Sequence, residues 1–245
     1  MILERPNRAR VGVFSLAEHS PTGHDRDYLA WHLLDHLPEQ YRIDGVLFGQ
    51  RWVSTPACRA ARADAAAGGS LAPVDHVTHY LFGPPVDAAL DDFLALGAEL
   101  AGLDRYPTRL PSAMLANFEV AAVAAAPRVR VSPEAIPFRP NRGAYLVAEP
   151  AVDGVAAADH QAWTLENLAQ LVAVDGVAGA WRFTPGSRRP DRFDARGLSL
   201  TICYLDAEPA EVAAGLERVL VPAWKRWGIR PELAGPFETV RPPWA

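Results

Sequence analysis

The sequence predicts an α+β fold in which two copies of one βαββαβ unit pack together within a single chain. The first observation is an internal repeat, since Gly12–Glu18 (GVFSLAE) resembles Gly143–Glu149 (GAYLVAE). The second is that Asp44–Trp52 (DGVLFGQRW) resembles Asp175–Phe183 (DGVAGAWRF) at the same offset of 131 residues. The third is a later pair of segments, YLFGPP and YLDAEP, which match at an offset of 124. Three matches in the same order indicate a duplicated chain.

Each copy is predicted to contain the same elements in the same order. Short apolar runs predict strands, a 3.6-residue apolar period predicts helices, and a proline precedes the second helix of each copy. In the first copy these elements are a strand at Val11–Ala17, a helix at about Asp25–Leu37, strands at Val46–Trp52 and Asp75–Phe82, a helix at Val86–Leu100, and a last strand at either Phe118–Ala124 or Arg128–Val131. In the second copy they are Ala144–Glu149, Ala157–Val172, Val177–Phe183, Leu198–Leu205, Ala210–Leu220 and Phe237–Val240. The order βαββαβ is that of the ferredoxin-like split βαβ motif.

The repeat also predicts how the chain is divided. The first ferredoxin-like unit covers residues 1–126, and the second covers residues 143–245. Between them, residues 127–142 contain four prolines and are predicted to be a linker.

The composition is that of an ordinary soluble globular protein, with 49% hydrophobic and 22% charged residues among 245. No apolar run approaches the roughly 18–20 residues that a membrane helix needs. Lysine occurs once, at Lys225, and no basic stripe predicts nucleic-acid binding. Cys58 and Cys203 are predicted to be reduced thiols. We therefore expect a cytoplasmic monomer or homodimer that binds a small hydrophobic or aromatic molecule, and neither nucleic acid nor a membrane.

A motif in the first helix points to a known superfamily. The pattern W-H-x-x-D-H-L-P-E at Trp31–Glu39 leads to an Asp-Gly turn and to Arg51-Trp52 at a strand end. This combination resembles the dimeric α/β-barrel superfamily, in its EthD-like and related uncharacterised branch. The resemblance implies two units that pack sheet to sheet as a barrel with the helices outside. Because the superfamily includes monooxygenases, cyclases, isomerases, haem-degrading enzymes and members without known activity, it implies the fold more strongly than the function.

The same helix supplies the first candidate site residues. His32 and His36 lie four residues apart, so a regular helix would place them on one face. At 100° per residue, His36 borders the apolar arc of the helix, whereas His32 and Asp35 lie farther out. We therefore expect His36 to point into a pocket of the first copy, within reach of a polar residue on the third strand. His32 and Asp35 are expected to stay exposed.

The strand at Asp75–Phe82 carries a second group of polar residues. Alternation along a strand places His76, Thr78 and Tyr80 on one face and His79 on the other. At the offset of 124, the counterparts of the first three in the second copy form an apolar row: Leu200, Ile202 and Tyr204. Polar residues in place of core residues predict a polar-lined pocket in the first copy. The alternatives are that this face is solvated or that the loop after Trp52 covers it.

A metal site at the two histidines is the next hypothesis to weigh. His-x-x-Asp-His resembles a zinc-binding pattern that has Glu in place of Asp35, but a zinc site needs at least three protein ligands. No third ligand is evident in the sequence, so we predict no bound metal. Haem would require a committed axial ligand, which the sequence does not identify.

Two functions from different classes follow. The first is an enzyme without an organic cofactor, in which a histidine with a pKa near neutrality moves a proton during an isomerisation, cyclisation, dehydration or oxygenation. The second is a non-enzymatic small-ligand-binding or stress-associated scaffold. For the enzyme, the predicted catalytic residues are His36, Tyr80, His76 and His79, and the predicted substrate-binding residues are Trp31, Trp52, Tyr28 and Phe48. Arg51 and Arg182 recur in both copies and are predicted to be structural.

Overall fold

The computed structural model describes residues 7–106, 110–150 and 157–241. Its strands close into one antiparallel barrel in the order β1-β3-β2-β8-β5-β7-β6-β4. The strands are β1 (Val11–Glu18), β2 (Val46–Val53), β3 (Val74–Phe82), β4 (Ser112–Ala125), β5 (Gly143–Pro150), β6 (Val177–Pro185), β7 (Leu198–Leu205) and β8 (Leu233–Thr239). The α+β class and the barrel are therefore confirmed.

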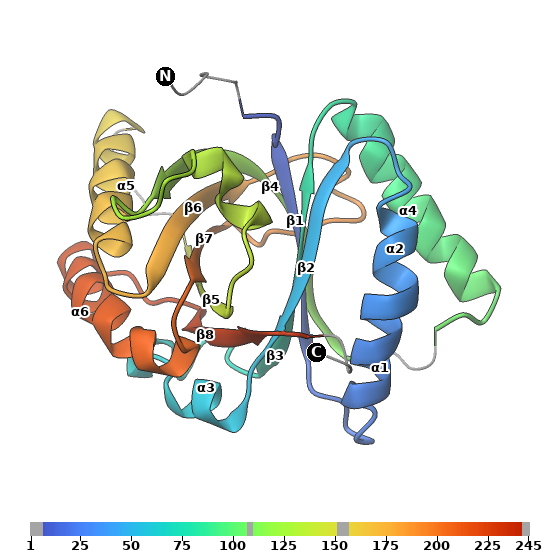
Figure 1. Cartoon of the computed structure of the whole chain (residues 1–245), viewed down its shortest axis with the longest axis horizontal. Coiled ribbons are helices and arrows are strands. Elements are labelled where there is room, and N and C mark those ends of the chain that lie inside the picture. The colour runs from blue at the N-terminus through green and yellow to red at the C-terminus, as the bar shows by residue number, and fades with distance from the viewer. Residues whose placement is uncertain (1–6, 107–109, 151–156, 242–245) are drawn as a thin grey trace.

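The helices lie outside this barrel, as Figure 1 shows. They are α1 (Asp25–Trp31), a π-helical turn (His32–His36), α2 (Leu37–Gln40), α3 (Pro56–Ala60), α4 (Val86–Gly102), α5 (Ala157–Val172) and α6 (Pro209–Trp227), with 3₁₀ turns at Asp64–Ala66 and Pro133–Phe138. Helices α1, α2 and α4 cover one side of the barrel, and α5 and α6 cover the opposite side. None of the described helices is long and apolar enough to span a membrane.

Most of the predicted boundaries agree with the structure to within a few residues. Of the two alternatives for the last strand of the first half, Phe118–Ala124 lies inside β4. The second half differs more. Helix α6 continues to Trp227 with Pro222 inside it, and β8 begins at Leu233, four residues before the predicted start.

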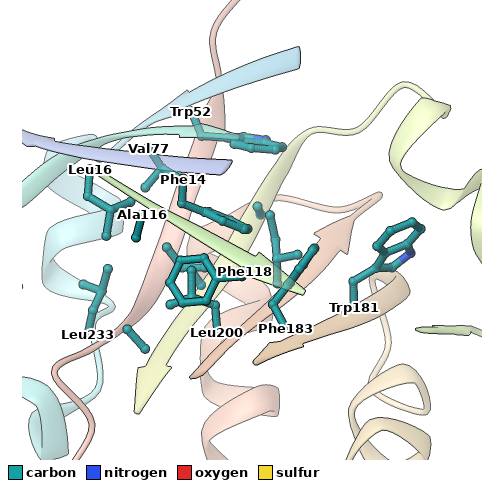
Figure 2. Close-up of a cluster of buried hydrophobic side chains, with 14 of the residues drawn as sticks. Phe14, Leu16, Trp52, Val77, Ala116, Phe118, Trp181, Phe183, Leu200 and Leu233 are labelled. Atoms are coloured by element: carbon teal, nitrogen blue, oxygen red, sulfur yellow. The ribbon is translucent and has the colours of Figure 1, made fainter. Parts of the chain in front are cut away.

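The barrel interior is filled by large apolar side chains from the inward faces of its strands. Figure 2 shows part of this cluster, in which the Phe14 ring packs edge-on against Phe118 and Phe183, and Trp52 belongs to the same cluster. Gly12 is required at this point, because a Cβ atom there would lie 2.7 Å from the Phe183 ring. Two further apolar clusters lie between the outer faces of the strands and the helices on either side. The described part of the barrel interior is therefore packed as core.

The strand pairing corrects the register in which the two halves were compared. Val11 pairs with Phe82 across β1 and β3, and Gly143 pairs with Leu205 across β5 and β7. These two pairs are equivalent because the backbone N–H groups of Arg10 and Arg142 donate to the carbonyls of Phe82 and Leu205. In addition, Phe14 and Leu16 of β1 face the barrel interior, as Leu146 and Ala148 of β5 do. Equivalent residues therefore differ by 132 positions on β1 and β5 and by 123 on β3 and β7. The sequence matches had used 131 and 124. A slip of one residue moves every side chain to the other face of a strand.

This shift overturns the comparison made for the third strand. The residues of β7 that are equivalent to His76, Thr78 and Tyr80 are Ser199, Thr201 and Cys203, which also lie on the outer, helix-covered face. The apolar row of Leu200, Ile202 and Tyr204 faces the barrel interior instead. A polar outer face on this strand is thus common to both halves, and its polarity alone does not mark a pocket.

Candidate functional site

A pocket of about 490 Å³ lies between the outer face of the first-half strands and helices α1, α2 and α4. Its polar lining comes mainly from Tyr28, His32, His36, Arg51, Tyr80 and Tyr106. Apolar residues of α4 and β4 form the opposite wall. Concave sites with an apolar lining and a few convergent polar groups are the usual small-molecule sites of proteins.

The π-helical turn decides which histidine faces this pocket. The backbone N–H of Leu37 donates to the carbonyl of His32, so the chain makes an i→i+5 turn in place of the regular helical turn. This wider turn changes the orientation of the residues around it relative to the regular helical wheel. His32 is consequently only 2% exposed, so the expectation that it lies on a solvated face was wrong. Asp35 is exposed, as predicted.

His32 and Tyr80 form a buried pair at the wall of the pocket. The His32 Nε2 atom lies 3.0 Å from the Tyr80 hydroxyl, and the remaining His32 Nδ1 atom has no partner among the described residues. Burial, with a smaller contribution from Arg51, holds the pKa of His32 well below its usual value. Burial also raises the pKa of Tyr80. Both groups are therefore neutral near pH 7.

His36 lines the same pocket, as expected, but its polar partner is different from the one predicted. The Gln40 amide donates to His36 Nε2 over 3.0 Å, and the Trp31 ring stacks on the imidazole at a centroid distance of 4.8 Å. Burial, followed by the nearby charge of Arg51, lowers the pKa of His36 to about 4. The expectation of a histidine that titrates near neutrality at this position was therefore wrong.

Arg51 is the functional candidate that sequence reasoning missed. Its side chain is 6% exposed and lies over the Tyr28 ring, with Cζ 4.7 Å from the ring centroid. One terminal nitrogen lies 3.4 Å from the Tyr28 hydroxyl, while Nε and the other terminal nitrogen have no partner among the described residues. A buried guanidinium without a carboxylate partner is unusual. Its recurrence as Arg182 had suggested a purely structural role.

The other two predicted catalytic histidines lie outside the pocket. His76 is buried beside helix α1, where its Nε2 atom is 2.7 Å from Asp25 Oδ1, and this contact ties α1 to β3. His79 points to the opposite face of the strand and stacks on Phe14 inside the barrel at 4.1 Å. Strand alternation explains the separation of His79 from its neighbour Tyr80.

The four predicted substrate-binding aromatic residues divide in the same way. Tyr28 lines the pocket, and Trp31 lies behind it against His36. Trp52 and Phe48 belong to the barrel cluster. Trp52 follows Arg51 on β2, so the two side chains must point to opposite faces of the strand.

The described residues contain no cluster of three or more His, Cys, Asp or Glu side chains that could hold a metal ion. The Nε2 atoms of His32 and His36 already contact Tyr80 and Gln40. Cys58 and Cys203 are free and buried, and neither lines the pocket.

The buried histidines predict a dependence of stability on pH. Burial lowers the pKa of His79 to about 3 and that of His36 to about 4, whereas an unfolded histidine titrates near 6.5. The unfolded chain therefore binds more protons than the folded chain between about pH 4 and 6.5, and stability falls as the pH is lowered through this window. Each pKa unit corresponds to about 1.4 kcal/mol.

Thermal unfolding midpoints recorded from pH 7.5 to 4.5 test this prediction. His79→Ile is the matched variant, because Ile202 occupies the equivalent barrel position in the second half. The variant should lose less of its stability on acidification than the parent protein. Parallel pH curves for the two proteins would contradict a buried, neutral His79.

Comparison with solved structures identifies the fold. An anthrone oxidase-like protein aligns with a TM-score of 0.55 and 11% identity over 96% of this chain and 93% of its own. A candidate monooxygenase from Fusobacterium nucleatum gives 0.53 and 9% over 97% and 94%. A candidate chlorite dismutase gives 0.53 and 12% over 96% of both chains. No protein-family model and no curated protein sequence matches the chain. The chain therefore shares the ferredoxin-like α/β-barrel fold with these proteins.

Proposed function

We propose that this protein is a small-molecule enzyme that transfers a proton on a hydrophobic or aromatic substrate in the first-half pocket, without an organic cofactor. One observation carries the proposal: a buried, neutral His32–Tyr80 pair lies at the wall of a pocket large enough for a ligand. Perturbed titratable groups in a cleft are typical of catalytic sites. The π-helical turn that supplies His32 is also a feature often found at functional sites.

The pair would act as a relay. A substrate hydroxyl or an activated C–H bond beside Tyr80 gives its proton to the Tyr80 oxygen, while Tyr80 passes its own proton to His32 Nε2. The imidazolium and the substrate anion form together, so each compensates the charge of the other in a site of low dielectric constant. Because burial lowers the pKa of His32, the imidazolium readily gives its proton back to Tyr80, and Tyr80 gives its own to the product, once the substrate anion has reacted.

Oxidation or oxygenation of an electron-rich aromatic substrate, with molecular oxygen as the electron acceptor, is the reaction type that the comparisons favour. Two proteins of the same fold carry the names anthrone oxidase-like protein and candidate monooxygenase. Removal of a proton from a phenol or an enolisable ketone is the step that this chain's own residues supply. At this level of identity the comparisons support the choice of reaction class by analogy of fold.

Hydrogen–deuterium exchange tests the proton-transfer step separately from any later oxidation. The purified protein should accelerate exchange at the acidic carbon of enolisable aromatic ketones, with anthrone as the first probe, in oxygen-free D₂O. Ala101→Trp is the control, because Ala101 lines the pocket and a tryptophan there would fill it. Exchange that is no faster than in buffer for the whole panel, or that survives Ala101→Trp, would argue against the proposed site.

A non-enzymatic ligand-binding protein is the second candidate. It is favoured by the fact that both histidines already have internal partners through Nε2. Saturable ligand binding to the same pocket without exchange or turnover would support this function.

We also infer that the two halves descend from one duplicated ferredoxin-like unit of the EthD-like type. The strand order β4-β1-β3-β2 of the first half recurs as β8-β5-β7-β6 in the second, and β2 pairs with β8 and β4 with β6 to close the barrel. One chain thus completes the barrel without a partner subunit, which supports a monomer as the working unit.

A further inference from the structure

We propose that Arg51 anchors an anionic group, and that the natural ligand of the first-half pocket is an otherwise apolar molecule with a carboxylate. This inference rests on the proposed function in that it names the substrate class for the same site. The second half of the chain contains a similar arrangement, in which an equivalent arginine is paired with a carboxylate of the protein itself.

Arg51 and Arg182 are equivalent by strand pairing. Arg51 lies opposite Thr78 across β2 and β3, and Arg182 lies opposite Thr201 across β6 and β7. Both arginines are almost fully buried on the helix-covered side of their strands. The difference between the two halves is therefore in what surrounds the arginine.

In the second half the arginine is neutralised by the protein itself. An Arg182 terminal nitrogen lies 2.6 Å from Glu149 Oε1 and 2.9 Å from the Thr201 hydroxyl. The indole N–H of Trp224 donates to the other Glu149 oxygen over 2.9 Å. All four side chains are buried, so the carboxylate sits in a dry site with donors on both oxygens.

In the first half the glutamate and the tryptophan are absent. Glu149 on β5 is equivalent to Ala17 on β1. Helices α4 and α6 correspond at an offset of 123, because Ala89 and Val212 make the same contacts with the glycines before β2 and β6 and the same first helical hydrogen bond. Trp224 is therefore equivalent to Ala101. Both Ala17 and Ala101 line the pocket.

The pocket is thus the space that Glu149, Trp224 and a neighbouring leucine occupy in the other half. Leu220 is buried against the second-half sheet, and its equivalent Gly97 lines the pocket. Three large side chains are replaced by two alanines and a glycine, while the arginine and threonine are kept. A ligand that fills this space with an apolar body, and presents a carboxylate to Arg51, would reproduce the packing of the second half.

The charges around the pocket also favour an anionic ligand. None of the described lining residues is acidic, although the whole chain has a net charge of −5. Arg192, an exposed residue on the segment between β6 and β7, adds a second cation to the lining. Thr78 has a hydroxyl without a partner among them, where Thr201 contacts Arg182. Leaving a buried charge unpaired is costly, so an anionic ligand that pairs with Arg51 would bind favourably.

Matched pairs of aromatic carboxylates and their neutral amides test the proposal on the full-length protein. Benzoate against benzamide and 1-naphthoate against 1-naphthamide are compared by isothermal titration calorimetry. The carboxylate should bind about 30-fold or more tightly than the amide, the usual effect of a buried charge pair. In Arg51→Gln the affinity for the carboxylate should fall to about that for the amide, so the preference should disappear.

Ala17→Glu provides an independent test that does not remove the arginine. The new carboxylate should pair with Arg51 as Glu149 pairs with Arg182, so the variant should no longer bind carboxylate ligands. It should also melt about 4 °C or more above Ala17→Gln, which has the same size without the charge. This comparison remains decisive if Arg51→Gln fails to fold.

The outcomes separate this inference from the proposed function. Equal affinity for carboxylates and amides, a preference that survives Arg51→Gln, or equal stability of the two Ala17 variants would each overturn the anion site. Arg51-dependent binding of carboxylates without any proton exchange would uphold the anion site and contradict the enzyme. Exchange on neutral ketones alone, with no carboxylate preference, would do the reverse.

Discussion

Replacement of Tyr80 by phenylalanine is expected to reduce turnover by about 10²–10⁴-fold while leaving the fold intact. The change removes only the hydroxyl that contacts His32 Nε2 over 3.0 Å, and the ring stays packed against Phe93. Without this hydroxyl, no group passes a proton from the pocket to the buried imidazole. Substrate affinity should change much less than the rate of the chemical step, because the hydroxyl acts mainly in the transition state.

Tyr204→Phe is the matched control for this variant. Tyr204 is equally buried on β7, but its side chain lies in the barrel interior and its hydroxyl has no partner among the described residues. Steady-state kinetics on both variants, with the substrate found by exchange screening, should show a loss only for Tyr80→Phe. If Tyr80→Phe keeps full activity, or both variants lose it together, the relay is not the catalytic group.

His32 must then behave as the second member of the same relay. His32→Gln keeps a polar side chain beside Tyr80 but cannot be protonated, so its loss of activity should match that of Tyr80→Phe, and the double variant should lose little more.

The fold could be predicted from the sequence because its signals are redundant. Apolar alternation, Asp-Gly turns and the repeat itself all indicate the same order of elements, and small errors in their boundaries do not alter the barrel. The position of the pocket in the first half, next to His36, could also be predicted from the amphipathic first helix.

The details of the site could not be predicted from the sequence, because they depend on shifts of a single residue. One i→i+5 turn brings His32, and not only His36, to the pocket. One residue of register between the halves decides whether Tyr80 is compared with Tyr204 or with Cys203. Local identity favoured the wrong register, since GVFSLAE and GAYLVAE align best at 131, whereas the residues that face the barrel interior on β1 and β5 match at 132.

The correct register would have revealed the most informative contrast in the sequence. At an offset of 132, Ala17 stands where the second half has Glu149, although Arg51 and Arg182 are both kept. An arginine present in both halves and a carboxylate present in only one is the contrast on which we base the proposed anion site at Arg51. No property of Arg51 considered alone could show this.

Replacement of Glu149 by glutamine is expected to lower the free energy of unfolding by about 3–5 kcal/mol, the usual effect of breaking a buried ion pair from one side. The Glu149 carboxylate contacts Arg182 over 2.6 Å and Trp224 over 2.9 Å, and both partners are buried. Glutamine keeps the size and one acceptor, so the loss reports the uncompensated charge of Arg182.

Arg51→Met in the first half should cost far less or stabilise, because the charge it removes has no carboxylate partner among the described residues. The double variant Glu149→Leu/Arg182→Met should recover much of the stability that Glu149→Gln loses, since an apolar pair leaves no buried charge behind. Urea unfolding of the three variants measures these differences. Similar losses for Glu149→Gln and Arg51→Met would mean that the two arginines are in equivalent electrostatic surroundings, and the contrast between the two halves would not hold.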